Sequence, residues 1–293
     1  MGGKIDCYID ISSFYSYLAF FYLVSNLETL RGHGVEVEFH PVFAGVVQSN
    51  ADNTPPWAVS KQKRDYLADY ETGRAKAAFG KPEIVLPEDL RELLELGWTQ
   101  KACRALLYIK DHHPRHAYHT TWHYLFHSFW TATPRRNLRD EAVLAEVLAQ
   151  VPADFAGAST ITTIGQHCRD DAPSSSSSPS SSVSSTSITT AADAATTLFT
   201  PDDVAAIMAN QRSDTYKTML KHASQAVNAA GAFGVPWMIV RNDKNENKAA
   251  RSEPFFGSDR FHQIFQFLDL PVRSFELLPS RDGPRGGKDG AKL

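Results

Sequence analysis

The stretch Gly231-Ala232-Phe233-Gly234-Val235-Pro236 decides the fold of this chain. Glycine commonly ends a helix and proline fixes the backbone that follows, so the stretch predicts a helix passing into a strand through an X-Pro bond. Further along, Phe256-Gly257-Ser258-Asp259-Arg260 predicts a strand end, a tight Gly-Ser turn and a helix start. The N–H groups of that helix start, with a hydroxyl and a carboxylate, could hold the charged end of a small ligand.

The N-terminal part of the chain supplies a strand, a turn and a helix. Apolar residues alternate over Ile5–Ile11, which predicts a strand. Ser12 or Ser13 is a typical N-cap for the next segment, in which apolar residues recur at helical spacing. Two glycines then end the helix, and Val35–Phe39 alternates as a second strand. The sequence therefore predicts a β-α-β unit whose first turn is Ser13-Phe14-Tyr15-Ser16.

These segments and Asn53-Thr54-Pro55-Pro56 together carry a family resemblance. In this order they resemble kappa-class glutathione transferases and the related 2-hydroxychromene-2-carboxylate isomerases, within the DsbA-like thioredoxin superfamily. The resemblance covers roughly residues 4–130 and 201–270. It implies an α/β thioredoxin-like fold with four strands, an inserted all-helical domain, and a cis bond at Val235-Pro236 beside the Ser13 turn. The family usually has proline where this chain has Phe14, a change that could alter the rigidity of the turn and the shape of the pocket.

The domain organisation follows from this resemblance and from composition. We expect a thioredoxin-like domain from residues 1–54 plus about 215–275, a helical insertion over 55–214, and a flexible tail over 276–293. The segment at about 170–197 is a Ser-rich run that cannot bury enough apolar surface to fold, so we expect a disordered insertion there. Thr200-Pro201, an N-cap followed by proline, predicts where helix resumes.

The chemistry expected at the Ser13 turn depends on a missing thiol. Thioredoxin-fold oxidoreductases carry Cys-x-x-Cys at this turn, and without it exchange through a mixed disulfide is not available. A hydroxyl at a helix N-terminus instead favours the thiolate form of a bound thiol. The resemblance implies that Ser13 donates a hydrogen bond to the sulfur of glutathione, which is then the nucleophile. The alternatives are that Ser13 is only a helix N-cap, or that Ser16 shares the role.

The resemblance also implies which residues bind glutathione. Asp259 would hold the γ-glutamyl ammonium and Ser258 the adjacent carboxylate, although Asp259 could be only a helix N-terminal charge. Asn53 would contact glutathione through its amide, or simply form a turn before the prolines. Lys63 would pair with the glycyl carboxylate, but Lys61 and Arg64 lie beside it and make that assignment loose. The full expected glutathione-binding set is Phe14, Tyr15, Asn53, Lys63, Val235, Ser258 and Asp259, with Pro236 in a structural role.

Composition excludes some partners and suggests a compartment. A formal charge of −3 gives no long-range attraction to nucleic acid or an anionic membrane, and no apolar run is long enough to span a bilayer. The N-terminus leads directly into a strand, so we expect no signal peptide. Three widely separated cysteines favour a reducing compartment. Ala291-Lys292-Leu293 differs from the peroxisomal Ser-Lys-Leu address at one small residue, so we expect a peroxisomal protein, with a cytoplasmic one as the alternative.

A histidine cluster raises the question of a metal. Six histidines fall between His112 and His127, but the zinc-binding pattern His-Glu-x-x-His is absent. Because aromatic residues alternate with the histidines, we expect a packing face or a dimer surface and no metal cofactor. The aromatic excess between Trp98 and Trp130, together with the family habit, predicts a homodimer.

Three functions remain open at this point. The first is a kappa-type glutathione transferase that conjugates glutathione to a small hydrophobic electrophile or reduces a hydroperoxide. The second is a glutathione-dependent isomerase acting on an unsaturated ring carboxylate or ketone. The third is a non-catalytic binding protein on the same fold, favoured if Phe14 closes the turn.

Overall fold

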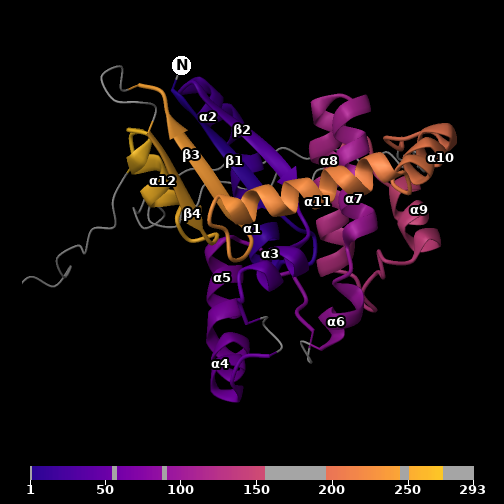
Figure 1. Ribbon diagram of the computed structural model, residues 1–293, viewed down its shortest axis with the longest axis horizontal. Helices are drawn as coiled ribbons and strands as arrows, with labels where there is room; N and C mark the ends of the chain where they lie inside the picture. Colours follow the sequence, from indigo (N-terminus) through magenta and orange to yellow (C-terminus); the bar gives the residue numbers. More distant parts are fainter. Residues whose placement is uncertain (1, 55–57, 88–90, 156–195, 245–250, 273–293) are drawn as a thin grey trace, which may run out of the picture.

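The chain folds around a four-stranded mixed sheet (Figure 1). The computed structural model describes residues 2–54, 58–87, 91–155, 196–244 and 251–272. The strands are β1 (Gly3–Ile9), β2 (Val35–Pro41), β3 (Trp237–Asn242) and β4 (Arg251–Phe256), in the order β2-β1-β3-β4. β1 runs parallel to β2, while β3 is antiparallel to both β1 and β4. The strands and their pairing confirm the predicted β-α-β unit and the four strands that the resemblance implies.

One face of the sheet carries the main core. Ile5, Cys7 and Ile9 are fully buried on this face, as the alternation of β1 requires. They pack in one cluster with α1 (Phe14–Ser25) and α12 (Phe261–Phe267). The short helix α2 (Leu27–Gly32) follows α1 and leads into β2.

The opposite face is covered by α3 (Ala44–Asn50) and α11 (Asp214–Ala229). Val47 of α3, Val227 of α11 and Trp237 of β3 form a second, smaller core there. α11 also contacts α7, so it extends from the sheet to the helical part of the molecule (Figure 1). This helix therefore ties the predicted insertion to the sheet.

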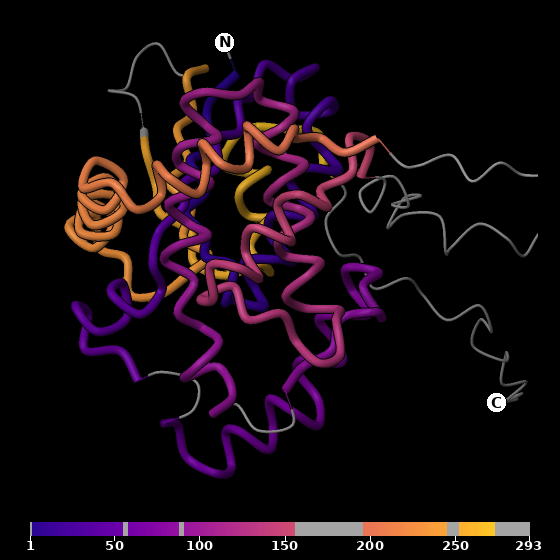
Figure 2. Tube along the Cα trace, turned by 90° about the vertical axis from the view of Figure 1, so that its right-hand side faces the viewer, coloured from indigo at the N-terminus to yellow at the C-terminus, as the bar shows by residue number. Residues whose placement is uncertain are grey.

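The helical part comprises most of the segments between β2 and α11. They are α4 (Lys61–Tyr66), the π-helical η1 (Leu67–Glu71), α5 (Thr72–Ala78), α6 (Glu92–Leu96), α7 (Gln100–His112), α8 (Arg115–Trp130), α9 (Glu141–Ala149) and α10 (Pro201–Asn210). α8 packs on α1, where the ring of Tyr17 stacks on that of Phe126 at 5.0 Å. In Figure 1 the helices α7, α8, α9 and α10 lie on the right, and Figure 2 shows the molecule from that side.

Several predicted boundaries move by a few residues. The first strand ends at Ile9 and not Ile11, because Asp10 turns the chain and its carboxylate accepts the Ser12 N–H. Thr200 caps α10 with a capping box and Pro201 occupies the first turn, as predicted. The Ser-rich segment lies almost wholly outside the described residues, and the tail lies outside them completely, so both expectations stay predictions.

Two histidines of α8, His119 and His123, pack against aromatic rings of the core. His123 is buried and contacts the rings of Phe20 and Phe21, while His119 contacts the ring of Phe39 edge-on. This confirms a packing face. The aromatic side chains that motivated the homodimer are largely buried within the chain itself, including Trp122, Phe126, Phe129 and Trp130. They no longer support a dimer, which stays a prediction.

Candidate functional site

Ser13 lies at the N-terminus of α1, facing the segment before β3. Its side chain accepts a hydrogen bond from the Ser16 N–H at 3.2 Å, which confirms that it is the N-cap. The same hydroxyl donates to the carbonyl of Val235 at 3.2 Å. Ser13 is half-buried, whereas Ser16 is fully buried. Ser13 is thus both the helix cap and the hydroxyl that faces Val235.

Val235 and Pro236 are joined by a cis peptide bond, as predicted. The N–H of Val235 makes no hydrogen bond to another described residue, although its carbonyl is engaged by Ser13. The carbonyl of Pro236 accepts from the N–H of Gly257 at 3.1 Å. The two sequence motifs that were far apart in the chain therefore meet at the end of the sheet, beside Ser13.

Asn53 is brought to the same loop. Its side-chain amide donates to the carbonyl of Phe233 at 2.6 Å. Gly234, the next residue, packs closely against the ring of Phe256 and the side-chain amide of Asn53. A Cβ at Gly234 would lie 3.0 Å from the Phe256 ring and 3.7 Å from the Asn53 amide nitrogen. Asn53 thereby holds the loop that carries Val235, and its amide oxygen accepts no hydrogen bond from the residues that the structure describes.

Ser258 and Asp259 follow Gly257 at the start of the α12 segment. Gly257 has a φ of +99°, and a Cβ at this position would lie 2.7 Å from the Asp259 carboxylate. Only glycine suits this turn, in which the carboxylate folds back over the backbone. Ser258 is buried, while the side chain of Asp259 is 67% exposed and pairs with Arg260 at 3.4 Å. Asp259 is thus accessible to a cationic group of a ligand.

Tyr15 connects the Ser13 turn to Asp259. Burial, together with the negative charges of Glu71 and Asp259, raises the pKa of Tyr15 to about 12. The half-buried phenol therefore lies within the electrostatic reach of Asp259, on the side of the turn next to η1. The structure brings Ser13, Tyr15, Asn53, Val235, Ser258 and Asp259 to one end of the sheet.

Phe14, which replaces the usual proline, turns its ring into the protein. The side chain is 6% exposed and meets Trp130 of α8 at 6.0 Å between ring centroids. The indole N–H of Trp130 in turn donates to the carbonyl of Ile11 at 2.8 Å. Phe14 therefore fills the contact between α1 and α8, and only its backbone is left to face a ligand.

Lys63 is not brought to this cluster. It lies on α4, where its N–H is capped by Ser60, and no contact among the described residues joins its side chain to Ser13, Val235 or Asp259. In both views α4 lies at the bottom of the molecule, on the far side of α5 from the sheet (Figures 1 and 2). Its role toward a glycyl carboxylate stays a prediction.

Asp10 is the first residue that sequence reasoning missed. It is fully buried, and its carboxylate accepts from the Ser12 N–H at 3.1 Å, the Ala44 N–H at 2.7 Å and the Thr99 hydroxyl at 2.5 Å. Burial raises its pKa, and the hydrogen bonds oppose that rise. One carboxylate thus links the Ser13 turn to the start of α3 and the start of α7. The only signal in the sequence was a charged residue at the end of an apolar strand.

Trp98 is the second missed residue. It is 48% exposed, and its ring lies 6.0 Å from that of Phe43, which precedes α3. The neighbouring Gly97 lies against the turn, since a Cβ there would be 3.6 Å from the Ser12 Cβ. The junction of α6 and α7 therefore places an exposed indole beside the Ser13 turn. In the sequence, Trp98 counted only toward the aromatic excess that predicted a homodimer.

Three further features of the described residues bear on the chemistry of the chain. Within the described parts of the chain, no group of three or more His, Cys, Asp or Glu side chains is placed to hold a metal ion. No helix among those residues has both the length and the apolar character that crossing a bilayer requires. The cysteines Cys7 and Cys103 are buried and reduced, and burial raises the pKa of both.

The comparisons with known proteins agree with this architecture. No family model matches the chain. A curated relative, glutathione S-transferase kappa 1 of Caenorhabditis elegans, is 22% identical over 282 residues, covering 95% of this chain and 94% of its own. A solved 2-hydroxychromene-2-carboxylate isomerase aligns with a TM-score of 0.56 at 15% identity, covering 91% of this chain and 94% of the isomerase.

A second solved structure, the probable DsbA oxidoreductase SCO1869 from Streptomyces coelicolor, aligns with a TM-score of 0.52 at 14% identity and covers 97% of both chains. The fold is therefore thioredoxin-like α/β with a DsbA-like helical insertion, as predicted. The resemblance to kappa-class glutathione transferases is confirmed over nearly the whole chain. The two solved structures are each under 25% identical to this chain, so their likeness shows the fold alone.

Proposed function

We propose that this chain is a glutathione transferase of the kappa type. The observation that carries the proposal is the Ser13 hydroxyl, which lies 3.2 Å from the Val235 carbonyl at the cis-proline loop, next to an open Val235 N–H. The full-length resemblance to a kappa-class transferase supports it. The cysteines in the described residues are buried, so the thiol for the reaction must come from the substrate.

Ser13 acts on the sulfur of glutathione. A free thiol has a pKa of about 8.5 and is mostly protonated at neutral pH. The Ser13 hydroxyl turns from the Val235 carbonyl to the sulfur and donates to it, while the N-terminal end of the twelve-residue helix α1 adds a favourable dipole. The thiol loses its proton to water, the thiolate attacks the electrophile, and the leaving group departs with the electron pair of its bond.

The remaining contacts hold the peptide. Val235 offers its N–H to the cysteinyl backbone of glutathione, in the manner of an added strand. Asp259 pairs with the γ-glutamyl ammonium and Ser258 with the neighbouring carboxylate. Tyr15 and the backbone of Phe14 line the site. The roles of Asn53 in contacting glutathione and of Lys63 in holding the glycyl carboxylate rest on the resemblance alone.

Trp98 and Phe43 form the wall for the electrophile. An exposed indole beside the Ser13 turn is suited to a small hydrophobic or aromatic compound. Conjugation and hydroperoxide reduction use the same thiolate, so the site supports either. The physiological electrophile is set by this wall, which the glutathione-binding motifs do not describe.

A glutathione-dependent isomerase is the second candidate. The structural likeness to a 2-hydroxychromene-2-carboxylate isomerase favours considering it, and the thiolate would add reversibly to an unsaturated carbonyl compound. A non-catalytic binding protein is less favoured, because Phe14 packs inward and leaves the turn open. A homodimer and a peroxisomal location remain proposals from the sequence, to be tested by sedimentation and by the location of a fluorescent fusion that keeps the native C-terminus.

Two measurements separate the candidates. Titration of glutathione by calorimetry is expected to give saturable binding; no heat at millimolar glutathione would leave only the binding-protein hypothesis. Side-by-side assays with a halonitrobenzene, cumene hydroperoxide and an unsaturated ring carboxylate then distinguish transferase, peroxidase and isomerase. Turnover of the ring carboxylate alone would replace the transferase by the isomerase.

A further inference from the structure

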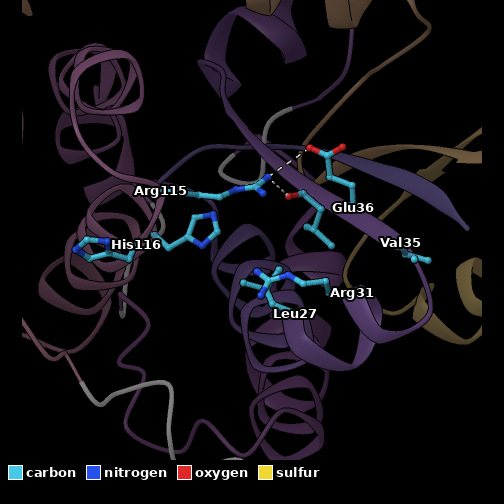
Figure 3. A pocket seen from close by; sticks show the side chains of 9 residues that line it. Leu27, Arg31, Val35, Glu36, Arg115 and His116 are labelled. Carbon is cyan, nitrogen blue, oxygen red and sulfur yellow. Dashed lines mark hydrogen bonds and ion pairs between the residues drawn. The ribbon is translucent and has the colours of Figure 1, made fainter. Parts of the chain in front are cut away.

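A second cavity lies at the opposite end of the sheet from Ser13. It has a volume of about 360 Å³ and is formed by α2, the start of β2 and the start of α8 (Figure 3). Val35, which lines it, pairs with Gly3 at the beginning of β1, whereas Ser13 follows the end of β1. A seven-residue strand is about 20 Å long. The cavity is therefore separate from the proposed thiol site.

The lining combines an apolar floor with cationic and imidazole groups. Leu27, Val35 and Val37 provide the apolar part. Arg31 and Arg115 enter from α2 and α8, on two sides of the cavity (Figure 3). The other lining residues are Gly34, Glu36, His116 and His119.

Arg115 is held in place with donors to spare. Its Nη2 donates to the Val37 carbonyl at 2.9 Å and to the Glu38 carboxylate at 2.8 Å, and it lies 3.6 Å from Glu36. Among the described residues, its Nε and Nη1 groups make no hydrogen bond or ion pair. A guanidinium has five N–H donors, so most of the Arg115 donors remain available to a ligand.

Arg31 is a second available cation. Its guanidinium makes no hydrogen bond or ion pair to any residue that the structure describes, and the residue is exposed. Glu36 turns toward Arg115 in Figure 3, so it does not neutralise Arg31. Two guanidinium groups with open donors thus share one cavity with an apolar floor.

We propose that this cavity binds a small organic carboxylate, whose charged group is held by Arg31 and Arg115 and whose apolar body rests on Leu27, Val35 and Val37. Planar guanidinium groups bind carboxylates through paired N–H donors, which gives direction as well as affinity. The volume is at the lower end of the range for small-molecule sites, about 300–1,000 Å³. The proposal is independent of the thiol chemistry proposed for Ser13.

His119 gives the site a pH dependence. It is mostly buried, and burial, together with the positive charges of Arg115, Lys110 and Arg31 and against the charge of Glu38, lowers its pKa to about 4. The charged and titratable groups around it are Arg31 on α2, Glu36 and Glu38 on β2, Lys110 on α7, and Arg115 and His116 on α8. A bound carboxylate favours protonated His119, so binding takes up a proton and strengthens as pH falls from the neutral range toward the His119 pKa of about 4.

The test uses benzoate, with benzyl alcohol as the uncharged control, and follows binding to the full chain by ligand-detected NMR. We expect benzoate to bind and benzyl alcohol not to bind. Arg31→Gln should weaken benzoate binding about tenfold, the order of one charge-assisted hydrogen bond. Arg212→Gln also removes one positive charge, from an exposed arginine that does not line the cavity, and should leave benzoate binding unchanged. His119→Phe should keep the ring contact with Phe39 and remove the part of the pH dependence that comes from His119.

Three results overturn the proposal. The first is no benzoate binding at pH 5.5, and the second is equal affinity in the wild type and Arg31→Gln. The third is binding that is lost in Trp98→Ala and retained in Arg31→Gln, since that would place benzoate at the thiol site. If Arg31→Gln lowers stability, its unfolding midpoint will show this, and His119→Phe still tests the site through the pH dependence.

Discussion

The Ser13 hydroxyl donates to the carbonyl of Val235, a residue 222 positions further along the chain. This contact joins the start of α1 to the cis-proline loop, and the Ser13 hydroxyl donates to no other acceptor among the described residues. A hydroxyl has one donor, so the Ser13 proton can serve the carbonyl or a bound sulfur, one at a time. We expect the glutathione sulfur to accept the hydrogen bond from Ser13. The Val235 carbonyl is then free to accept one from another group of glutathione or from water.

Replacing Ser13 by alanine tests this exchange. Ser13→Ala should lower turnover near neutral pH by about ten- to a hundred-fold, the order of one charge-assisted hydrogen bond, and raise the pKa of the bound thiol. The difference should shrink at high pH, where the thiol ionises unaided. Loss of the N-cap should cost about 1 kcal/mol of stability, so the fold and most of the glutathione affinity persist.

Ser16→Ala is the matched control for this prediction. Its hydroxyl is fully buried and makes no hydrogen bond in the structure, so its loss should leave turnover nearly unchanged. Ultraviolet absorbance of the bound thiolate as a function of pH gives the thiol pKa directly. Ser13→Ala with full activity at pH 6.5 would show that Ser13 is only a helix cap.

Asp259 should affect binding and not the chemical step. Asp259→Asn should raise the KM for glutathione about tenfold or more and leave kcat nearly constant, because a contact to the γ-glutamyl ammonium is the same in the ground and transition states. Asp243, a half-buried carboxylate just after β3 that pairs with Arg241, supplies the control Asp243→Asn. A fall in kcat with unchanged KM would place Asp259 in the reaction itself.

The sequence could predict the parts of the site that depend on local backbone geometry. Gly257, with a φ of +99°, and the cis Val235-Pro236 bond are positions that few residues tolerate, so their motifs are visible in one sequence. Ser13 was identifiable for the same reason, as a polar residue between a strand and a helix. Alternation predicted the first two strands and the resemblance implied four in all, although the first strand ended two residues early at Ile9.

The missed residues depend on contacts between distant segments. Asp10 meets Thr99 across 89 positions, and Trp98 reaches the turn only through the packing of Gly97 on Ser12. Arg31 and Arg115 line the same cavity because α2 and the start of α8 both lie beside β2. No local pattern contains such pairings. The aromatic excess of α8 was noticed, but a single sequence did not separate a core face from a dimer surface.

Asp10 should determine stability in a pH-dependent way. Asp10→Ala leaves the Ser12 and Ala44 N–H groups without their buried acceptor, at a cost of about 1–3 kcal/mol for each. We expect unfolding in urea at markedly lower concentration and loss of order at the Ser13 turn. Chevron or equilibrium unfolding would measure the change, and wild-type stability in Asp10→Ala would show that the carboxylate contributes nothing.

The sign of the pH effect follows from the raised pKa of Asp10. A carboxyl whose pKa is higher in the folded than in the unfolded state contributes most stability below its unfolded pKa, and that contribution is lost as pH rises through the folded value. Asp10→Asn removes this titration. The stability of Asp10→Asn relative to the wild type should therefore improve as pH rises from about 4 into the neutral range, and a constant difference would contradict the raised pKa.

Trp98 should control the electrophile and not glutathione. Its indole is 48% exposed beside the Ser13 turn, so Trp98→Ala removes apolar surface from the proposed wall without touching Val235 or Asp259. We expect kcat/KM for an apolar halonitrobenzene to fall about ten- to a hundred-fold, as for the loss of a buried aromatic contact of about 1.5–3 kcal/mol, with an unchanged KM for glutathione. Leu94→Ala is the control, because Leu94 is also exposed and only its backbone carbonyl accepts the Trp98 indole N–H. Equal losses in the two variants, or a rise in the KM for glutathione in Trp98→Ala, would show that the α6–α7 junction supports the turn and does not form the electrophile wall.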